Sequence, residues 1–105
     1  MSEVSVVQLD QLRKTNHSHL LLDVREPSEV RRAAIDGAVH IPMSQLSARV
    51  HELPPDTEVV VMCHHGQRSE RVAAMLRAKG FNNVKNLIGG IDAWSTDVDP
   101  SVARY

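Results

Sequence analysis

Cysteine, aromatic residues and long apolar runs are all scarce in this sequence. It has one cysteine, and tryptophan, tyrosine and phenylalanine occur once each. A single cysteine excludes an internal disulfide, which suits a reducing compartment. The apolar runs are only a few residues long, and no hydrophobic stretch follows the acidic start at Met1 to Glu3. We therefore expect neither a signal peptide nor a membrane span, and a cytoplasmic location.

An excess of charge of either sign is also absent. Lysine and arginine total 12, aspartate and glutamate total 13, and the two signs are interspersed along the chain. Without a basic stripe, nucleic acid and anionic membrane are not expected partners. The length of 105 residues suits one domain with a single core, so we expect one domain over residues 1–105. Residues from about 97 to 105 are expected to form a loosely ordered tail.

Strand-like and helix-like patterns alternate along the chain. Ser5 and Gln8 form a capping box before a first helix, and Ser44 is placed to cap a third helix. The patterns predict helices at about 6–14, 27–32, 45–52 and 69–79, strands at 20–24, 39–41, 58–62 and 84–87, and a helical turn at 91–94. Such alternation implies an α/β fold with a mainly parallel sheet and helices on both of its faces.

The single cysteine lies between a predicted strand and a predicted helix. Cys63 follows the apolar run 58–62 and precedes the helix, and Gly66 allows a tight turn between them. Free backbone N–H groups and the helix dipole favour an anion at such a corner, and they lower the pKa of a cysteine there. The alternative is a buried structural thiol. The strand, loop and helix context favours a reactive thiolate.

Three segments resemble the single-domain rhodaneses, which are sulfurtransferases. The loop Cys63-His-His-Gly-Gln-Arg-Ser69 is similar to their active-site pattern Cys-x-x-Gly-x-Arg-Ser. Leu20 to Pro27 resembles the first core strand and turn of that family, and Gly89 to Ser95 resembles its C-terminal signature. The resemblance covers nearly the whole chain. It implies a three-layer rhodanese-like fold with a central sheet of about five strands.

The resemblance also implies a reaction and its residues. Cys63 would take the outer sulfur of a donor such as thiosulfate, become a persulfide and pass the sulfur to a thiophilic acceptor. That acceptor would be cyanide in an assay and a thiol or a sulfur-relay protein in the cell, and no cofactor would be needed. The substrate-binding positions implied are the other loop residues, His64, His65, Gly66, Gln67, Arg68 and Ser69, with support from Asp23 and Arg25.

Two of these loop features have alternative interpretations. The Arg68 side chain can bind the sulfonate group of a donor, or it can form a structural ion pair with Asp23 or Glu26. His64 and His65 adjoin Cys63, but adjacent side chains rarely converge on one ion, so no metal site is expected. Either histidine, when protonated, would add positive charge for an anionic donor.

Two other function classes compete with sulfur transfer. Cysteine-dependent phosphatases and arsenate reductases have related folds or chemistry, but these phosphatases place five residues between the cysteine and the arginine. Here four residues separate Cys63 from Arg68, which disfavours a phosphate-sized ligand. The other alternative is a non-catalytic, regulatory binding module, since one fold can serve several functions.

Overall fold

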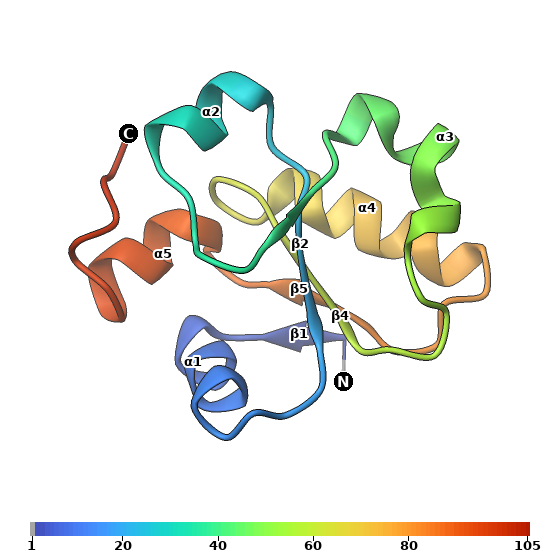
Figure 1. Ribbon diagram of the computed structural model, residues 1–105, viewed down its shortest axis with the longest axis horizontal. Coiled ribbons are helices and arrows are strands. Elements are labelled where there is room, and N and C mark those ends of the chain that lie inside the picture. The colour runs from blue at the N-terminus through green and yellow to red at the C-terminus, as the bar shows by residue number, and fades with distance from the viewer. Residues whose placement is uncertain (1) are drawn as a thin grey trace.

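The computed structural model describes residues 2–105, in which strands and helices alternate as the sequence predicts. Figure 1 shows the elements in order: β1 (Glu3–Val4), α1 (Val6–Lys14), β2 (Leu20–Asp23), α2 (Pro27–Arg32), β3 (Val39–His40), α3 (Leu46–Arg49), β4 (Val59–Met62), α4 (Gln67–Ala78), β5 (Val84–Leu87) and α5 (Gly90–Asp97). Short 3-10 turns, Met43–Gln45 and Val50–Glu52, flank α3.

The strands of residues 2–105 form one parallel sheet of five strands in the order β1-β5-β4-β2-β3. At its centre, β2 and β4 run in register from Leu20 beside Val59 to Asp23 beside Met62. The segments that follow these two strands therefore leave the same edge of the sheet. This register brings the chain after Asp23 next to the chain after Met62.

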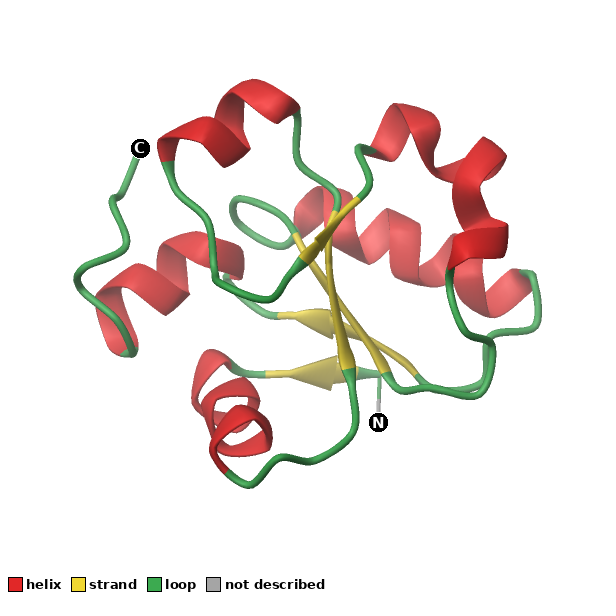
Figure 2. Cartoon of the chain, viewed as in Figure 1, coloured by secondary structure: helices red, strands yellow, loops and turns green. Residues whose placement is uncertain are grey.

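Helices cover both faces of the sheet, as Figure 2 shows. Because side chains alternate along a strand, Leu22 and Val61 face one side, and Leu21 and Val60 face the other. The first side packs against α3 and α4, and the second packs against α1 and α5. Both faces of β4 are buried, which is why its sequence is a continuous apolar run. The predicted three-layer α/β fold is confirmed.

The bounds of most elements agree with the sequence patterns. The helices α1 and α2 and the strand β5 have the predicted bounds, while α4 begins two residues earlier than predicted, at Gln67. The predicted helix 45–52 is wrong as one helix, because it divides into α3 and two 3-10 turns. Ser44 does not cap it, since the turn already begins at Met43 after Pro42. The two-residue strand β1 was not predicted, because it is too short to show alternation.

The segment after α5 returns toward α2 (Figure 1). The sequence indicated loose order from about residue 97, but Asp97 belongs to α5, and Val98 and Val102 pack against the core. A turn is closed by the Asp99 carboxylate, which accepts the backbone N–H and the hydroxyl of Ser101. Tyr105 is also partly buried there. Among the described residues, no helix is long and apolar enough to cross a membrane.

Candidate active site

The loop between β4 and α4 wraps around the Cys63 sulfur. Its Sγ atom accepts the backbone N–H of Gly66 at 3.1 Å and that of Ser69 at 3.4 Å, and the Ser69 Oγ lies 3.3 Å away. Gly66 makes this turn possible, because its φ of +107° is in the left-handed region that glycine adopts without strain. The loop thus forms a cradle of hydrogen-bond donors around one sulfur atom.

These donors determine the protonation state of the thiol. Burial of Cys63 favours the neutral form and raises its pKa. The hydrogen bonds from the Ser69 side chain and from the backbone N–H groups of Ser69, Gly66 and His65 together outweigh burial, so the pKa of Cys63 lies below its ordinary value. The site therefore stabilises a buried thiolate, which is the form that attacks electrophilic sulfur.

Asn86 of β5 supports the cradle from behind. Its Oδ1 accepts the Ser69 hydroxyl at 2.5 Å, and its Nδ2 donates to the Gly66 carbonyl oxygen at 3.1 Å and to Glu70 at 3.0 Å. The sequence analysis did not select Asn86. The one available signal was a polar residue at a buried position of a strand, where its amide needs partners.

The first turn of α5 holds the carbonyl groups of Cys63 and His64. The N–H of Ile91 donates to the Cys63 carbonyl at 2.9 Å, and that of Asp92 donates to the His64 carbonyl at 3.1 Å. Gly90 lies so close that a Cβ atom there would overlap both carbonyl oxygens. The glycine pair 89–90 thus permits the close backbone approach beside the loop.

Arg68 and Arg25 form separate ion pairs. The Arg68 guanidinium binds both carboxylate oxygens of Glu29, at 2.6 and 2.8 Å, so the predicted partners Asp23 and Glu26 were wrong. This hydrogen-bonded pairing lowers the pKa of Glu29 to about 2 and raises the pKa of Arg68.

Arg25 is fully buried, and its side chain binds both carboxylate oxygens of Asp23 at 2.9 and 2.7 Å. Asp23 and Arg25 therefore lie beneath the site.

The two loop histidines have different surroundings. His65 is exposed, with its Nδ1 4.0 Å from an Asp92 carboxylate oxygen. The His64 ring lies against the His65 ring on one side and stacks on the Tyr105 ring on the other, with 3.9 Å between centroids in each pair. Burial, followed by the charge of His65, lowers the pKa of His64.

Gln67 is exposed at the start of α4. Within residues 2–105, no group of three His, Cys, Asp or Glu side chains is placed to hold a metal.

Tyr105 joins the ion pairs to the loop. Its hydroxyl accepts from Nη1 of Arg25 at 2.9 Å and donates to Glu29 at 2.8 Å, while its ring stacks on His64 at an interplanar angle of 7°. Neither Tyr105 nor Glu29 was selected from the sequence. They belong to segments whose patterns indicate an exposed helix and a tail, and only the fold places them together.

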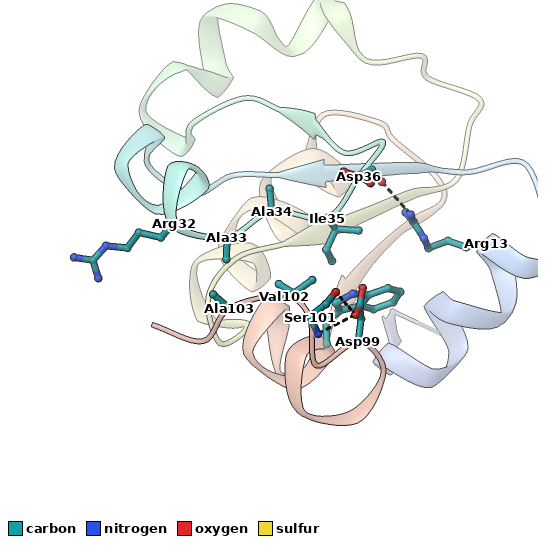
Figure 3. Close-up of a pocket in the computed structure, with 11 residues that line it drawn as sticks. Arg13, Arg32, Ala33, Ala34, Ile35, Asp36, Asp99, Ser101, Val102 and Ala103 are labelled. Carbon is teal, nitrogen blue, oxygen red and sulfur yellow. Dashed lines mark hydrogen bonds between the residues drawn. The ribbon is translucent and has the colours of Figure 1, made fainter.

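One surface hollow borders the loop, and another lies away from it. One of about 440 Å³ borders it and is lined by Glu3, His65, Gly66, Gln67, Glu70, Arg71, Asn86, Ile88 and Gly89. Figure 3 shows the other, of about 390 Å³, where the Arg13 side chain points toward Asp36 and donates to its carbonyl oxygen at 2.9 Å. Its described lining includes no residue of the loop 63–69. The first hollow therefore adjoins the loop at residues 65–67.

Comparisons with known proteins agree with this geometry. The family model of the rhodanese-like domain matches residues 5–97. The chain is 36% identical to a sulfurtransferase of Allochromatium vinosum, covering 98% of this chain and 96% of that protein. A crystal structure of a rhodanese-related protein from Thermoplasma volcanium superposes with a TM-score of 0.86 at 30% identity, covering 100% of both chains.

Some relatives are much longer than this chain. It is 35% identical to the maize adenylyltransferase and sulfurtransferase MOCS3-2, matching 99% of this chain and 23% of that protein. It also spans 50% of a Bacillus subtilis relative that is 37% identical. The domain thus occurs both alone and as a part of larger proteins.

Proposed function

The chain belongs to the rhodanese-like domain family, and from this membership we propose that it transfers sulfane sulfur through a persulfide formed on Cys63. The observation that carries the proposal is the cradle of N–H donors around the Cys63 sulfur. Preorganised donors of this kind stabilise negative charge without reorganisation during the reaction. They suit a thiolate and, after loading, the terminal sulfur of a persulfide.

The proposed reaction has two displacement steps with no net redox change. The Cys63 thiolate attacks the outer sulfur of the donor, a new S–S bond forms, and the donor's own bond to that sulfur breaks. Thiosulfate would leave as sulfite, and an organic persulfide would leave as a thiolate. The acceptor, cyanide in an assay or a thiol in the cell, then attacks the outer sulfur and restores the Cys63 thiolate. This covalent route requires no cofactor.

The donor is proposed to be a small sulfur-containing anion, and the acceptor a thiol or a protein. Relatives named as sulfurtransferases, one of them also an adenylyltransferase, support a place in a sulfur relay. The loop residues His64 to Ser69 are proposed to surround the bound sulfur. Among them, Gly66 and Ser69 act through the N–H groups already hydrogen-bonded to Sγ.

Phosphate transfer is disfavoured by the state of the loop arginine. A cysteine-dependent phosphatase needs a guanidinium free to bind phosphate oxygens, whereas Arg68 is bound at both terminal nitrogens by Glu29. The remaining alternative is a binding module that catalyses no reaction. The donor set around Cys63 favours catalysis, because docking alone does not require a stabilised thiolate.

Intact-mass measurement tests the proposal. The reduced protein would be weighed before and after exposure to thiosulfate or to glutathione persulfide, and again after cyanide, with Cys63→Ala treated in parallel. We expect one added sulfur atom on the native chain, its removal by cyanide with formation of thiocyanate, and no gain on the variant. If neither donor adds sulfur to the native chain, the binding module becomes the better interpretation.

A further inference from the structure

One side chain outside the loop contacts His64 directly and is linked to Arg68 through Glu29. The ring of Tyr105 lies flat on His64, the residue after the nucleophile, with 3.9 Å between ring centroids. Its hydroxyl donates to Glu29 at 2.8 Å, and that carboxylate binds Arg68. Tyr105 is itself held in place by Arg25, which is fully buried and donates to the hydroxyl at 2.9 Å.

These contacts pair or bury two of the three basic side chains of the loop, Arg68 and His64. Arg68 is paired at both terminal nitrogens with Glu29. His64 lies between the rings of His65 and Tyr105, and its Nε2 is buried without a partner in the described part of the chain. Protonation there would leave a buried N–H without an acceptor, which disfavours the charged ring. The third basic group of the loop, His65, is exposed, and its Nδ1 lies 4.0 Å from an Asp92 carboxylate that also binds Arg104 at 2.9 Å.

The groups that face His64 shift its pKa in both directions. His65 lies on its own loop and disfavours a second positive charge, whereas Glu29 of α2 and Asp92 of α5 favour one. Tyr105, in the segment after α5, acts in both directions: its ring buries His64, which disfavours the charge, and a backbone hydrogen bond with Tyr105 favours it. The ring of Tyr105 is therefore the contact whose removal would expose His64 to water and allow its protonation.

We propose that Tyr105 is a positioning residue that keeps His64 uncharged and holds Glu29 on Arg68, and thereby favours organic persulfide donors over the dianion thiosulfate. This inference rests on the proposed sulfurtransferase function. A thiosulfate dianion brings two charges to a loop that offers neutral N–H donors. A persulfide anion brings one ionised sulfur, which the cradle around Cys63 can accept in full.

Loading kinetics with two donors test the proposal. The second-order rate constant for adding sulfur to Cys63 would be measured by acid quench and intact mass, with thiosulfate and with glutathione persulfide, at pH 6 and pH 8. For Tyr105→Ala we expect the ratio of thiosulfate to persulfide rate constants to rise about fivefold at pH 6, because one added charge acts near the donor. At pH 8, where histidine is neutral, the ratio should return to the native value.

Further variants distinguish the possible causes of a changed donor ratio: the ring on His64, the charge of Glu29 and the packing of the last segment. Tyr105→Phe keeps the ring on His64 and should keep the native ratio at pH 6. Glu29→Gln releases Arg68 from a charged partner and should raise the ratio at both pH values. Val102→Ala removes packing from the same segment without touching His64 or Glu29, and should leave the ratio unchanged. If Tyr105→Ala fails to fold, Tyr105→Leu fills similar space without an aromatic face and takes its place.

Two results would overturn the proposal while leaving the sulfurtransferase function intact. The first is a Tyr105→Ala protein that loads sulfur with the native donor ratio at both pH values. The second is a native protein that loads faster from thiosulfate than from the persulfide. Failure of the native protein to load sulfur from either donor would instead contradict the proposed function, so the two failures are distinguishable.

Discussion

At the residue scale, Ser69 has one hydroxyl proton and two acceptors for it. The hydroxyl donates to Asn86 at 2.5 Å, and the Cys63 sulfur lies 3.3 Å from the same oxygen. When Cys63 is a thiol, its S–H can donate to Ser69. When Cys63 is ionised, the Ser69 hydroxyl must turn from Asn86 to the sulfur if it is to stabilise the thiolate. The acceptor of the Ser69 hydroxyl therefore depends on the charge of Cys63.

Replacing Ser69 with alanine should make the thiol less acidic. The variant removes the side-chain donor and keeps the backbone N–H groups, and a hydrogen bond to a charged group contributes roughly 1.5–3 kcal/mol. We expect the pKa of Cys63 to rise and its alkylation by iodoacetamide at pH 7 to slow by about tenfold. The rate would be measured against pH. Ser95→Ala is the matched control, since that buried hydroxyl bonds to Ile91 within α5. An unchanged pH profile in Ser69→Ala would contradict this role.

Sequence reasoning identified the contiguous part of the site and missed the rest. Cys63, Gly66 and Ser69 lie within seven consecutive residues, and their roles follow from local chemistry at a strand end and a helix start. Glu29, Asn86 and Tyr105 lie far from that loop along the chain and reach it only through the sheet order and the return of the last segment. Arg68 shows the same limit, because an ion pair was one of its two predicted roles, and the partner Glu29 was not predicted.

At the element scale, helix α5 fixes the loop through its first turn. Two N–H groups at its start donate to the carbonyl oxygens of Cys63 and His64. This arrangement holds the carbonyl oxygens of Cys63 and His64 against α5, while the N–H groups of His65, Gly66 and Ser69 donate to the sulfur. The sequence predicted only a helical turn at 91–94, because glycines at the start of α5 weaken the pattern there.

Substituting Gly90 with alanine tests this close approach. Gly90 has a φ of +58°, and an added Cβ would overlap the carbonyl oxygens of Cys63 and His64, so the backbone would have to move. We expect a loss of about 3 kcal/mol in unfolding free energy, measured by urea denaturation. Gly80→Ala is the control, with a φ of +99° and no atom within 4 Å of its added Cβ, so it should lose only about 1 kcal/mol. Equal losses in the two variants would show that the contact with the loop contributes little.

At the scale of the whole molecule, the elements are joined in two different ways. The helices α1, α4 and α5 are held by apolar side chains against the sheet. By contrast, α2 has no buried residue. It is connected to α4 and to the last segment by the contacts of Glu29 with Arg68 and Tyr105. Polar contacts therefore complete the domain where apolar packing is missing.

This dependence on Glu29 predicts how stability varies with pH. Its hydrogen bonds with Arg68, opposed by burial and aided by the Glu26 N–H and by Tyr105, lower its pKa from 4.5 to about 2 in the folded protein. The folded state therefore binds fewer protons than the unfolded state between these values. The stabilisation is complete above about pH 4.5 and is lost as the pH falls toward 2. Because the pair is partly exposed to solvent, we expect it to contribute about 2 kcal/mol at pH 7.

Glu29→Gln should remove this contribution. We expect the variant to be less stable than the native protein by about 2 kcal/mol at pH 7. The difference should shrink as the pH is lowered from 4.5, because Glu29 of the unfolded chain takes up a proton there while Glu29 of the folded protein stays charged down to about pH 2. Urea denaturation at pH values from 7 to 3 would measure it. Glu52→Gln is the matched control, since Glu52 pairs with Arg49 in solvent within one short segment, and we expect no measurable change. A Glu29→Gln protein that is destabilised equally at pH 7 and pH 3 would mean that side-chain shape, and not charge, joins α2 to the domain.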